Sequence, residues 1–120
     1  MVCFALIATA TAATAQDTWA NYDPAKPVTL AGPLRVVDID GGVVVVVIDV
    51  PVQREGKTTT MAWRIVLDTP DALERAGMSM EAFTHGVLVE VRGLSHRLTQ
   101  LHARAEEVTI RRRTAVLRPK

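Results

Sequence analysis

The sequence predicts a mainly β protein, a small barrel of five strands with one short helix between the third and the fourth. Five segments show either the apolar alternation or the apolar run of β-strands. Polar turns that contain glycine separate the first three, and one segment after the third has the start and stop signals of a helix. The chain has 120 residues, 48% hydrophobic and 22% charged, which suits a single globular domain. Its formal net charge of +1 provides no overall field that would attract nucleic acid or a membrane.

The first three strands are expected at residues 28–39, 43–52 and 58–68. The DGG sequence at residues 40–42 is a hairpin turn signal, and a second polar turn, containing Gly56, follows the second strand. Gly32 and Pro33 interrupt the first strand, as a bulge or bend does in a strongly curved strand.

The helix signals begin with TPD at residues 69–71, which supplies an N-cap, a proline at the first helical position and an acid in the first turn. Gly77 is expected to end the helix, and Ser79 to cap a short turn after it. The last two strands are expected at residues 87–94 and about 101–110. In the second of these the apolar parity changes, so Glu106 and Glu107 are expected to hold a bulge that restores the register.

Three strands, a helix and two strands are the order of the oligonucleotide/oligosaccharide-binding (OB) barrel. A flat five-stranded sheet with a helix packed on it would have the same order. We favour closure, because an open valine-rich sheet would expose aggregation-prone edges. The expected fold class is therefore a mainly β, OB-like barrel.

The second strand, GVVVVVIDVP at residues 42–51, is apolar on both faces, whereas a half-buried strand should alternate. The side chains expected inside the barrel are Val44, Val46, Ile48 and Val50, and those expected outside are Val43, Val45 and Val47. Such an outer stripe should be covered. An N-terminal arm carrying Trp19 and Tyr22 is the first choice, and the basic C-terminal tail or another subunit are the alternatives.

The N-terminal segment resembles an export signal, with a short apolar run and an Ala-Thr-Ala site at residues 13–15. No Lys or Arg precedes the run, which indicates a translation start further upstream or a degraded signal. Cleavage before Gln16 would remove Cys3, the only cysteine. The expected organisation is signal peptide 1–15, N-terminal arm 16–27, barrel domain 28–113 and basic tail 114–120, in the periplasm, with no integral membrane segment in the mature chain.

The sequence also resembles a family of small exported bacterial proteins, domain of unknown function 6152, from about Trp19 to Ile110. The most specific stretches are YDPAKPVTLAG at residues 22–32 and PDALERAG at residues 70–77. Members of that family typically have paired histidines just before the aromatic residue and Asn-Pro-His in the first hairpin. This sequence has Asp17-Thr18 and the DGG turn there, so a metal site built on those histidines would not be inherited. The resemblance implies an exported location and a fold, and no activity.

No constellation of catalytic or metal-binding residues is apparent in the sequence. His85 and His96 are expected at opposite ends of the fourth strand, so a site shared by these two and His102 is not expected. Ser79 and Ser95, the only serines, fit a helix cap and a turn, and neither lies in a nucleophile elbow. We therefore expect no enzyme activity, no metal and no cofactor.

Nucleic-acid binding would require a basic groove with interleaved stacking aromatics, and Arg64, Arg92 and the arginines at residues 111–113 are not arranged with aromatics in that way. The sequence therefore favours a binding or interaction module whose partner is a protein or another copy of itself, and not nucleic acid. The expected binding residues are Trp19, Tyr22 and Asp23 with Val43, Val45 and Val47. The alternatives are a periplasmic copper- or zinc-binding module with a degenerate site and, with least support, an enzyme.

Overall fold

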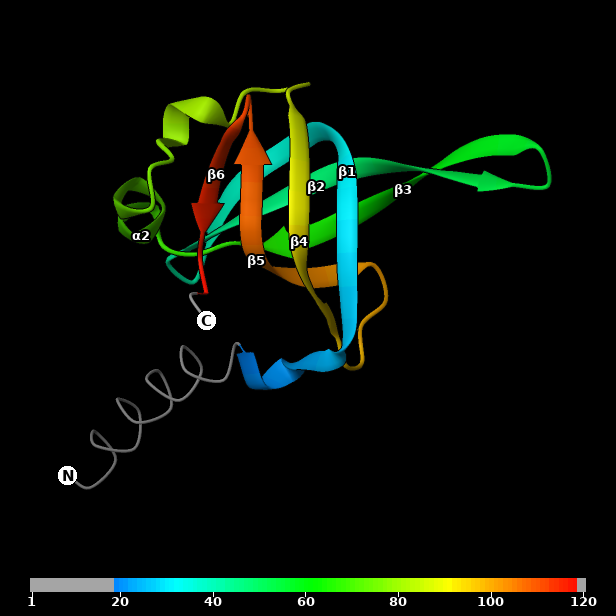
Figure 1. Ribbon diagram of the computed structural model, residues 1–120, viewed down its shortest axis with the longest axis horizontal. Helices are drawn as coiled ribbons and strands as arrows, with labels where there is room; N and C mark the ends of the chain where they lie inside the picture. Colours follow the sequence, from blue (N-terminus) through cyan, green and yellow to red (C-terminus); the bar gives the residue numbers. More distant parts are fainter. Residues whose placement is uncertain (1–18, 119–120) are drawn as a thin grey trace.

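The computed structural model describes residues 19–118, which form a small β-barrel with a long hairpin projecting from it (Figure 1). The expected signal peptide and its cleavage site lie outside the described residues, as do Asp17-Thr18 and the last two residues of the tail. In chain order the elements are η1 Trp19–Asn21, β1 Tyr22–Asp40, β2 Val43–Arg54, β3 Lys57–Val66, α2 Pro70–Arg75, η2 Met80–Ala82, β4 Leu88–His96, β5 His102–Ile110 and β6 Arg113–Val116.

The sheet closes on itself, which confirms the OB-like barrel. Its strand order is β3-β2-β1-β4-β5-β6, and β3 also pairs with β5. All neighbours are antiparallel except β3 and β5, which run parallel from Arg64↔His102 to Val66↔Arg104. The first half of β5 therefore completes the ring, and its second half pairs with β6.

β1 belongs to both sides of the barrel, because it changes partner midway. It pairs with β4 as far as Pro33 and with β2 from Leu34 onward. Gly32 lies at this change of partner, and a Cβ there would lie 2.1 Å from the carbonyl oxygen of Asp49. Only glycine allows so close an approach of the two backbones, which accounts for the expected bend.

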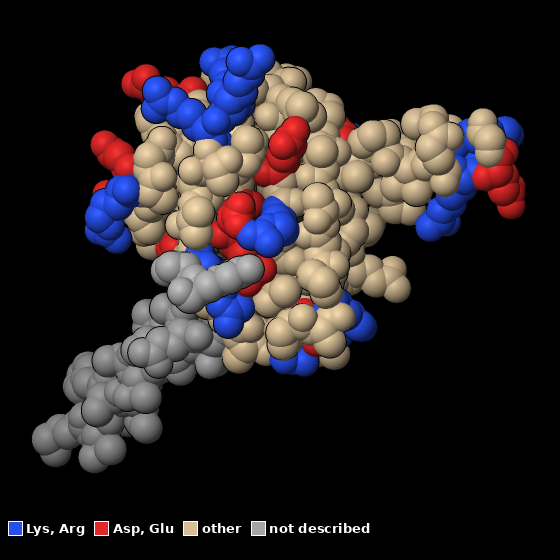
Figure 2. All heavy atoms as spheres, viewed as in Figure 1, with Lys and Arg blue, Asp and Glu red and all other residues tan. Residues whose placement is uncertain are grey.

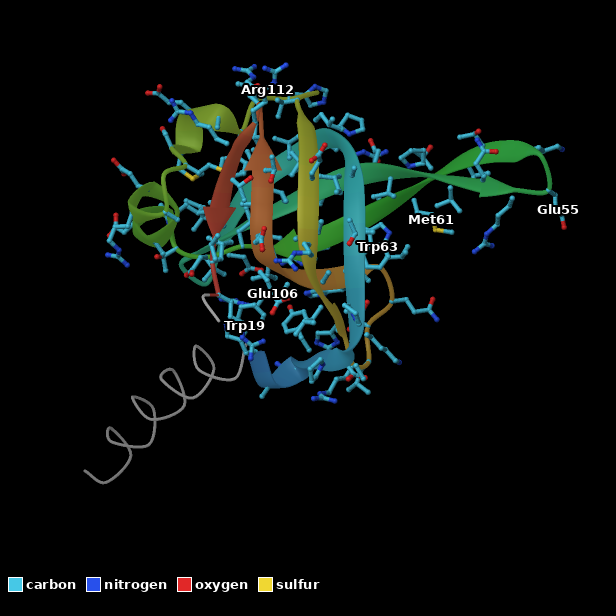
Figure 3. All side chains as sticks on the ribbon, viewed as in Figure 1. Trp19, Glu55, Met61, Trp63, Glu106 and Arg112 are labelled. Carbon is cyan, nitrogen blue, oxygen red and sulfur yellow. The ribbon has the colours of Figure 1, made fainter. Side chains whose placement is uncertain are left out.

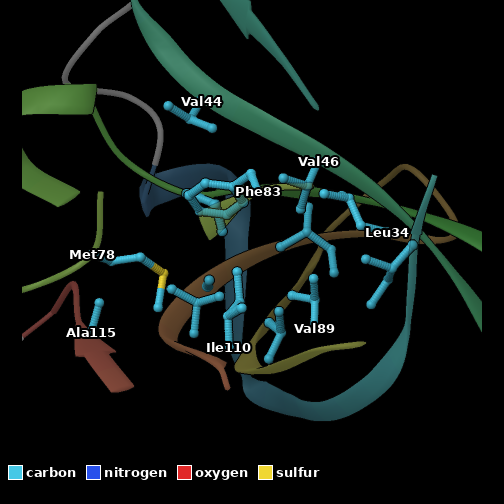
Figure 4. Close-up of a cluster of buried hydrophobic side chains, with 14 of the residues drawn as sticks. Leu34, Val44, Val46, Met78, Phe83, Val89, Ile110 and Ala115 are labelled. Carbon is cyan, nitrogen blue, oxygen red and sulfur yellow. The ribbon is translucent and has the colours of Figure 1, made fainter. Parts of the chain in front are cut away.

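The expected helix is confirmed, and it covers one end of the barrel. The Thr69 hydroxyl caps it by accepting a hydrogen bond from the Ala72 backbone N–H at 3.1 Å. Leu73 of α2, together with Met78 and Phe83 after it, joins the core cluster, which also contains the inward residues of β1, β2, β4 and β5 (Figure 4). The expected bulge is also present, because Arg92 pairs with Glu107 and Gly93 with Ala105, leaving Glu106 unpaired.

Two terminal segments differ from the expectation. Residues 22–27, expected in the arm, are the start of β1, where Tyr22 pairs with His96. Residues 113–116, expected at the end of the barrel domain and in the basic tail, form β6, and Ala115 is fully buried. Arg111 and Arg112 both have positive φ, 51° and 68°, and so form the reversing turn before β6. This hairpin could not be recognised from the sequence, because arginines occupy a turn that usually needs glycine or asparagine.

The inner valines of β2 are buried as expected, since Val44, Val46 and Ile48 have no exposed area. Val50, also expected inside the barrel, is only half-buried, because it lies where β2 runs on beyond the barrel. On the outer face, Val45 is only 3% exposed, while Val43 and Val47 are half-buried. Ladder pairing places Asp40 opposite Val43 and Arg64 opposite Val47. The Arg64 Nη2 lies 2.8 Å from the Asp40 Oδ2, so this ion pair runs from β3 to β1 across the outer side of β2 at Val45.

The burial of Val45 generates a stability prediction. Val45→Lys should lower the free energy of unfolding by about 2–4 kcal/mol, because the ammonium group would lie in a covered position. Val36→Lys is the matched control, since Val36 lies on the same outer face opposite Val47 and is 47% exposed. Urea denaturation would compare the two variants. Equal small effects would contradict the placement of Val45 under cover.

Candidate binding groove

A groove of about 620 Å³ lies at the end of the barrel opposite α2. The projecting part of the β2–β3 hairpin, residues 49–62, forms one wall and is called the finger below (Figure 1). The β4–β5 loop, residues 97–101, forms the other. Lys26 of β1 also lines the groove and is exposed.

The finger wall is an extension of the barrel interior. The inner row of β2 continues from Ile48 to Val50 and Val52, and on β3 from Trp63 to Met61. Ile48 is fully buried, whereas the other four are half-buried because the barrel no longer surrounds them. Met61 and Trp63 lie along the finger toward the barrel, and Glu55 marks its tip (Figure 3). The apolar composition of β2 thus serves the core at one end of the strand and the groove at the other.

The loop wall presents leucines to the groove. Leu98 is 90% exposed, and Leu101 beside it has a φ of 55°. Positive φ is uncommon for a leucine and stores strain that the surroundings must hold in place. The Leu101 carbonyl accepts a hydrogen bond from the Arg64 backbone N–H at 3.0 Å, which ties this strained residue to β3.

The charges around the groove have one sign. Lys26, Arg54 and Arg97 line it, and within residues 19–118 no Asp or Glu does. Arg54 lies at the finger tip, where charged side chains gather beyond an uncharged stretch (Figure 2). Arg97 is fixed in place, because its Nε donates to the Ala20 carbonyl at 3.0 Å and its Nη1 lies 3.9 Å from the Asp23 Oδ1. The groove, whose lining mixes apolar side chains with uncharged polar ones, therefore attracts anionic groups.

Two histidines meet at the base of the groove. His96 and His102 have ring centroids 4.9 Å apart, and the Tyr22 hydroxyl hydrogen-bonds the His102 Nε2 at 2.8 Å. Burial, reinforced by His96 and Arg64, lowers the pKa of His102 from its usual 6.5, and burial raises the pKa of Tyr22. Both groups are therefore uncharged at neutral pH. A site shared by the three histidines was not expected from the sequence; the structure brings His96 and His102 together across the β4–β5 ladder, while His85 lies before the start of β4.

The hydrogen bonds of His96 do not suit a metal site. Its Nδ1 accepts backbone N–H groups from Leu98 at 3.1 Å and Thr99 at 3.0 Å, so the neutral ring carries its proton on Nε2. The ring thus has no free lone pair, which a metal ligand requires. Within the part of the chain that the structure describes, no three His, Cys, Asp or Glu side chains cluster as metal ligands would.

Trp19 joins the N-terminal part of the described chain to its C-terminal part by packing on two arginines. Its ring lies between the guanidinium carbons of Arg104 and Arg118, at 4.4 Å and 4.3 Å from the ring centroid. Arg104 is buried, and its Nε and Nη1 have no hydrogen-bond partner among the described residues, so the indole face offsets part of its desolvation. Arg118 also approaches Glu106, which lies near Trp19 in Figure 3.

The residues expected to bind therefore fall into two groups. Tyr22 and Asp23 contact the groove residues His102 and Arg97, whereas Trp19 packs on Arg104 and Arg118, which do not line the groove. Val43, Val45 and Val47 lie on the outer face of β2 and do not line the groove. Sequence analysis missed the groove residues Val52, Met61, Trp63 and Leu98 as a binding set. The one feature that pointed to them is length: β2 and β3 are longer than the three residue pairs by which β3 and β5 close the barrel.

The closed ring, the parallel β3–β5 pairing and the groove at the β4–β5 loop define a small OB-type barrel protein. The family model described as "Family of unknown function (DUF6152)" matches residues 5–104, and the chain belongs to this family, as the resemblance indicated. No curated protein matches the chain.

Among solved structures, the chain is similar to a small single-stranded DNA binding protein from Mycoplasma pneumoniae. The two are 11% identical with a TM-score of 0.51, over 70% of this chain and 91% of the other. At this identity the likeness is one of fold. Among the helices of residues 19–118, none has the length and apolar composition needed to cross a membrane.

The lowered pKa of His102 generates a prediction about pH. The unfolded chain binds a proton at His102 at higher pH than the native protein does, so the free energy of unfolding should fall as the pH falls from 7.5 through 6.5 toward the native pKa. In His102→Gln this part of the slope should disappear. Urea denaturation of both proteins between pH 7.5 and pH 5.5 would measure it, and identical slopes would contradict the neutral buried histidine.

Proposed function

We propose that this protein is an exported, periplasmic binding module that acts by binding and not by catalysis, and that its groove holds anionic ligands with apolar parts. The observation that carries the proposal is that both walls contribute apolar side chains while the charged side chains of the lining have a single sign. Val52, Met61 and Leu98 supply the apolar surface, and Arg54 and Arg97 supply the cations. A concave apolar site with a few convergent polar groups is the usual form of a ligand site.

The base of the groove supports the same kind of ligand. His96 offers an Nε2–H donor, and Lys26 offers an ammonium group, so both can hydrogen-bond a carboxylate, sulfate or phosphate. The hydrogen bond between Tyr22 and His102 and the contact of Asp23 with Arg97 hold these elements in position without a ligand. A site that is already ordered loses less free energy on binding.

Dye binding tests the groove directly. Anilinonaphthalene sulfonate, an anionic aromatic dye, should bind the mature protein, and Leu98→Asp or Arg54→Glu should weaken binding about fivefold or more. Ile39→Asp and Arg113→Glu are matched controls, because both residues are exposed and neither lines the groove. Fluorescence titration, with amide NMR shifts to locate the dye, would measure this. Equal effects in the groove and control variants would refute the proposal.

Export supports the proposal through the Ala-Thr-Ala site at residues 13–15. If the full chain is expressed in a bacterium with a periplasm, the periplasmic fraction should contain a protein beginning at Gln16. Intact mass spectrometry of that fraction would identify the N-terminus. Recovery of the uncleaved chain in the cytoplasm alone would contradict the proposed location.

A further inference from the structure

The two edges of the finger differ. β3 pairs with β5 only at Arg64, Ile65 and Val66, so residues 57–62 of β3 have β2 as their only described neighbour. β2 pairs with β1 only as far as Ile48, so residues 49–54 have only β3. The finger is therefore a two-stranded ribbon with two unpaired edges, and such edges are available for another strand.

The edge of β2 is protected. Pro51 lies opposite Thr60 in the ladder and has no backbone N–H to offer. Proline is the usual residue for blocking an edge strand without loss of a ladder hydrogen bond. Asp49, next on this edge toward the barrel, pairs with Arg35 at 3.1 Å, which adds a charged contact on the same side.

The edge of β3 has no such protection. The Arg64 N–H points outward to the Leu101 carbonyl, and in an antiparallel ladder the backbone groups of alternate residues point the same way. Thr58, Thr60 and Ala62 therefore direct their N–H and C=O groups away from β2. The stretch from Thr58 to Ala62 is TTTMA, with no proline and no charge, and β-branched threonine favours extended backbone.

This open edge borders the groove. β5 lies beside β3 at Arg64, and its preceding residues, Gln100 and Leu101, turn away into the loop that forms the far wall. The space next to Thr58, Thr60 and Ala62 is thus the continuation of the β5 position in the sheet. A strand placed there would hydrogen-bond to β3 and direct alternate side chains into the groove.

We infer that β3 takes up an extended polypeptide segment of a partner protein as an added strand, whose groove-facing side chains, at every second position, include both apolar and acidic ones. This inference rests on the proposed function and names the ligand class of the same groove. Met61, Trp63 and Arg54 lie on one face of the finger, so only every second side chain of the added strand reaches the groove. Of these, the apolar ones would contact Met61 and Trp63, and the acidic ones would meet Arg54, Lys26 and Arg97. Charge argues against a second copy of this chain as the occupant, because pairing two β3 edges would bring two cationic grooves together.

The test uses the mature chain and a nonapeptide with blocked ends, in which the odd positions are valine and glutamate in turn and every even position is threonine, so that one face of the strand carries both kinds of side chain. On binding, the amides of Thr58, Thr60 and Ala62 should exchange with solvent at least about tenfold more slowly, since they enter a new ladder. Thr60→Pro should weaken peptide binding about tenfold or more, because it removes an N–H of the open edge and keeps the bonds to β2. Thr60→Val is the matched control, because it keeps the N–H, and it should bind the peptide normally.

Three outcomes would overturn the inference. The peptide could fail to protect these amides, or a short oligothymidine could bind the groove where the peptide does not. The same amides could also be protected without peptide in a concentration-dependent dimer, which would make a second copy the occupant. Dye binding distinguishes failure of this inference from failure of the proposed function, since Thr60→Pro should bind anilinonaphthalene sulfonate like the unchanged protein. A peptide failure with normal dye binding removes only this inference, whereas loss of groove-specific dye binding removes the proposed function.

Discussion

The barrel is closed by three residue pairs, Arg64 with His102, Ile65 with Ala103 and Val66 with Arg104. The remaining residues of β3 are not needed for closure, and with β2 they run on beyond the barrel as the finger. The same pairs position the start of β5 and hence the loop that faces the finger. The groove, its two walls and its open edge are therefore consequences of where the parallel pairing ends.

The apolar character of β2 follows from three different demands on one strand. Val44, Val46 and Ile48 fill the core, and Val50 and Val52 form the finger wall. The outer side is different, because the ion pair between Arg64 and Asp40 crosses it. An exposed ion pair contributes little stability by itself, but the two side chains lie over the strand at Val45, which is only 3% exposed.

Features that depend on a few adjacent residues could be predicted from the sequence. The cap at Thr69, the bend at Gly32 and the bulge at Glu106 each have a local signal, namely a capping side chain, a missing Cβ and a change of apolar parity. The meeting of His96 and His102 and the groove could not be predicted in this way. Both depend on which residues of distant strands pair, and a shift of one residue would turn every side chain to the other face.

The open edge of the finger is consistent with the low stability of the finger itself. A two-stranded ribbon is marginally stable in water, and only the base of this one, around Trp63, packs against the core. Residues 53–60 are all exposed, so the outer part gains little from burial. A third strand would add a second ladder and cover the apolar row from Val52 to Met61. Part of the binding free energy would then be spent on ordering the finger, which favours moderate affinity and ready exchange of partners over permanent assembly.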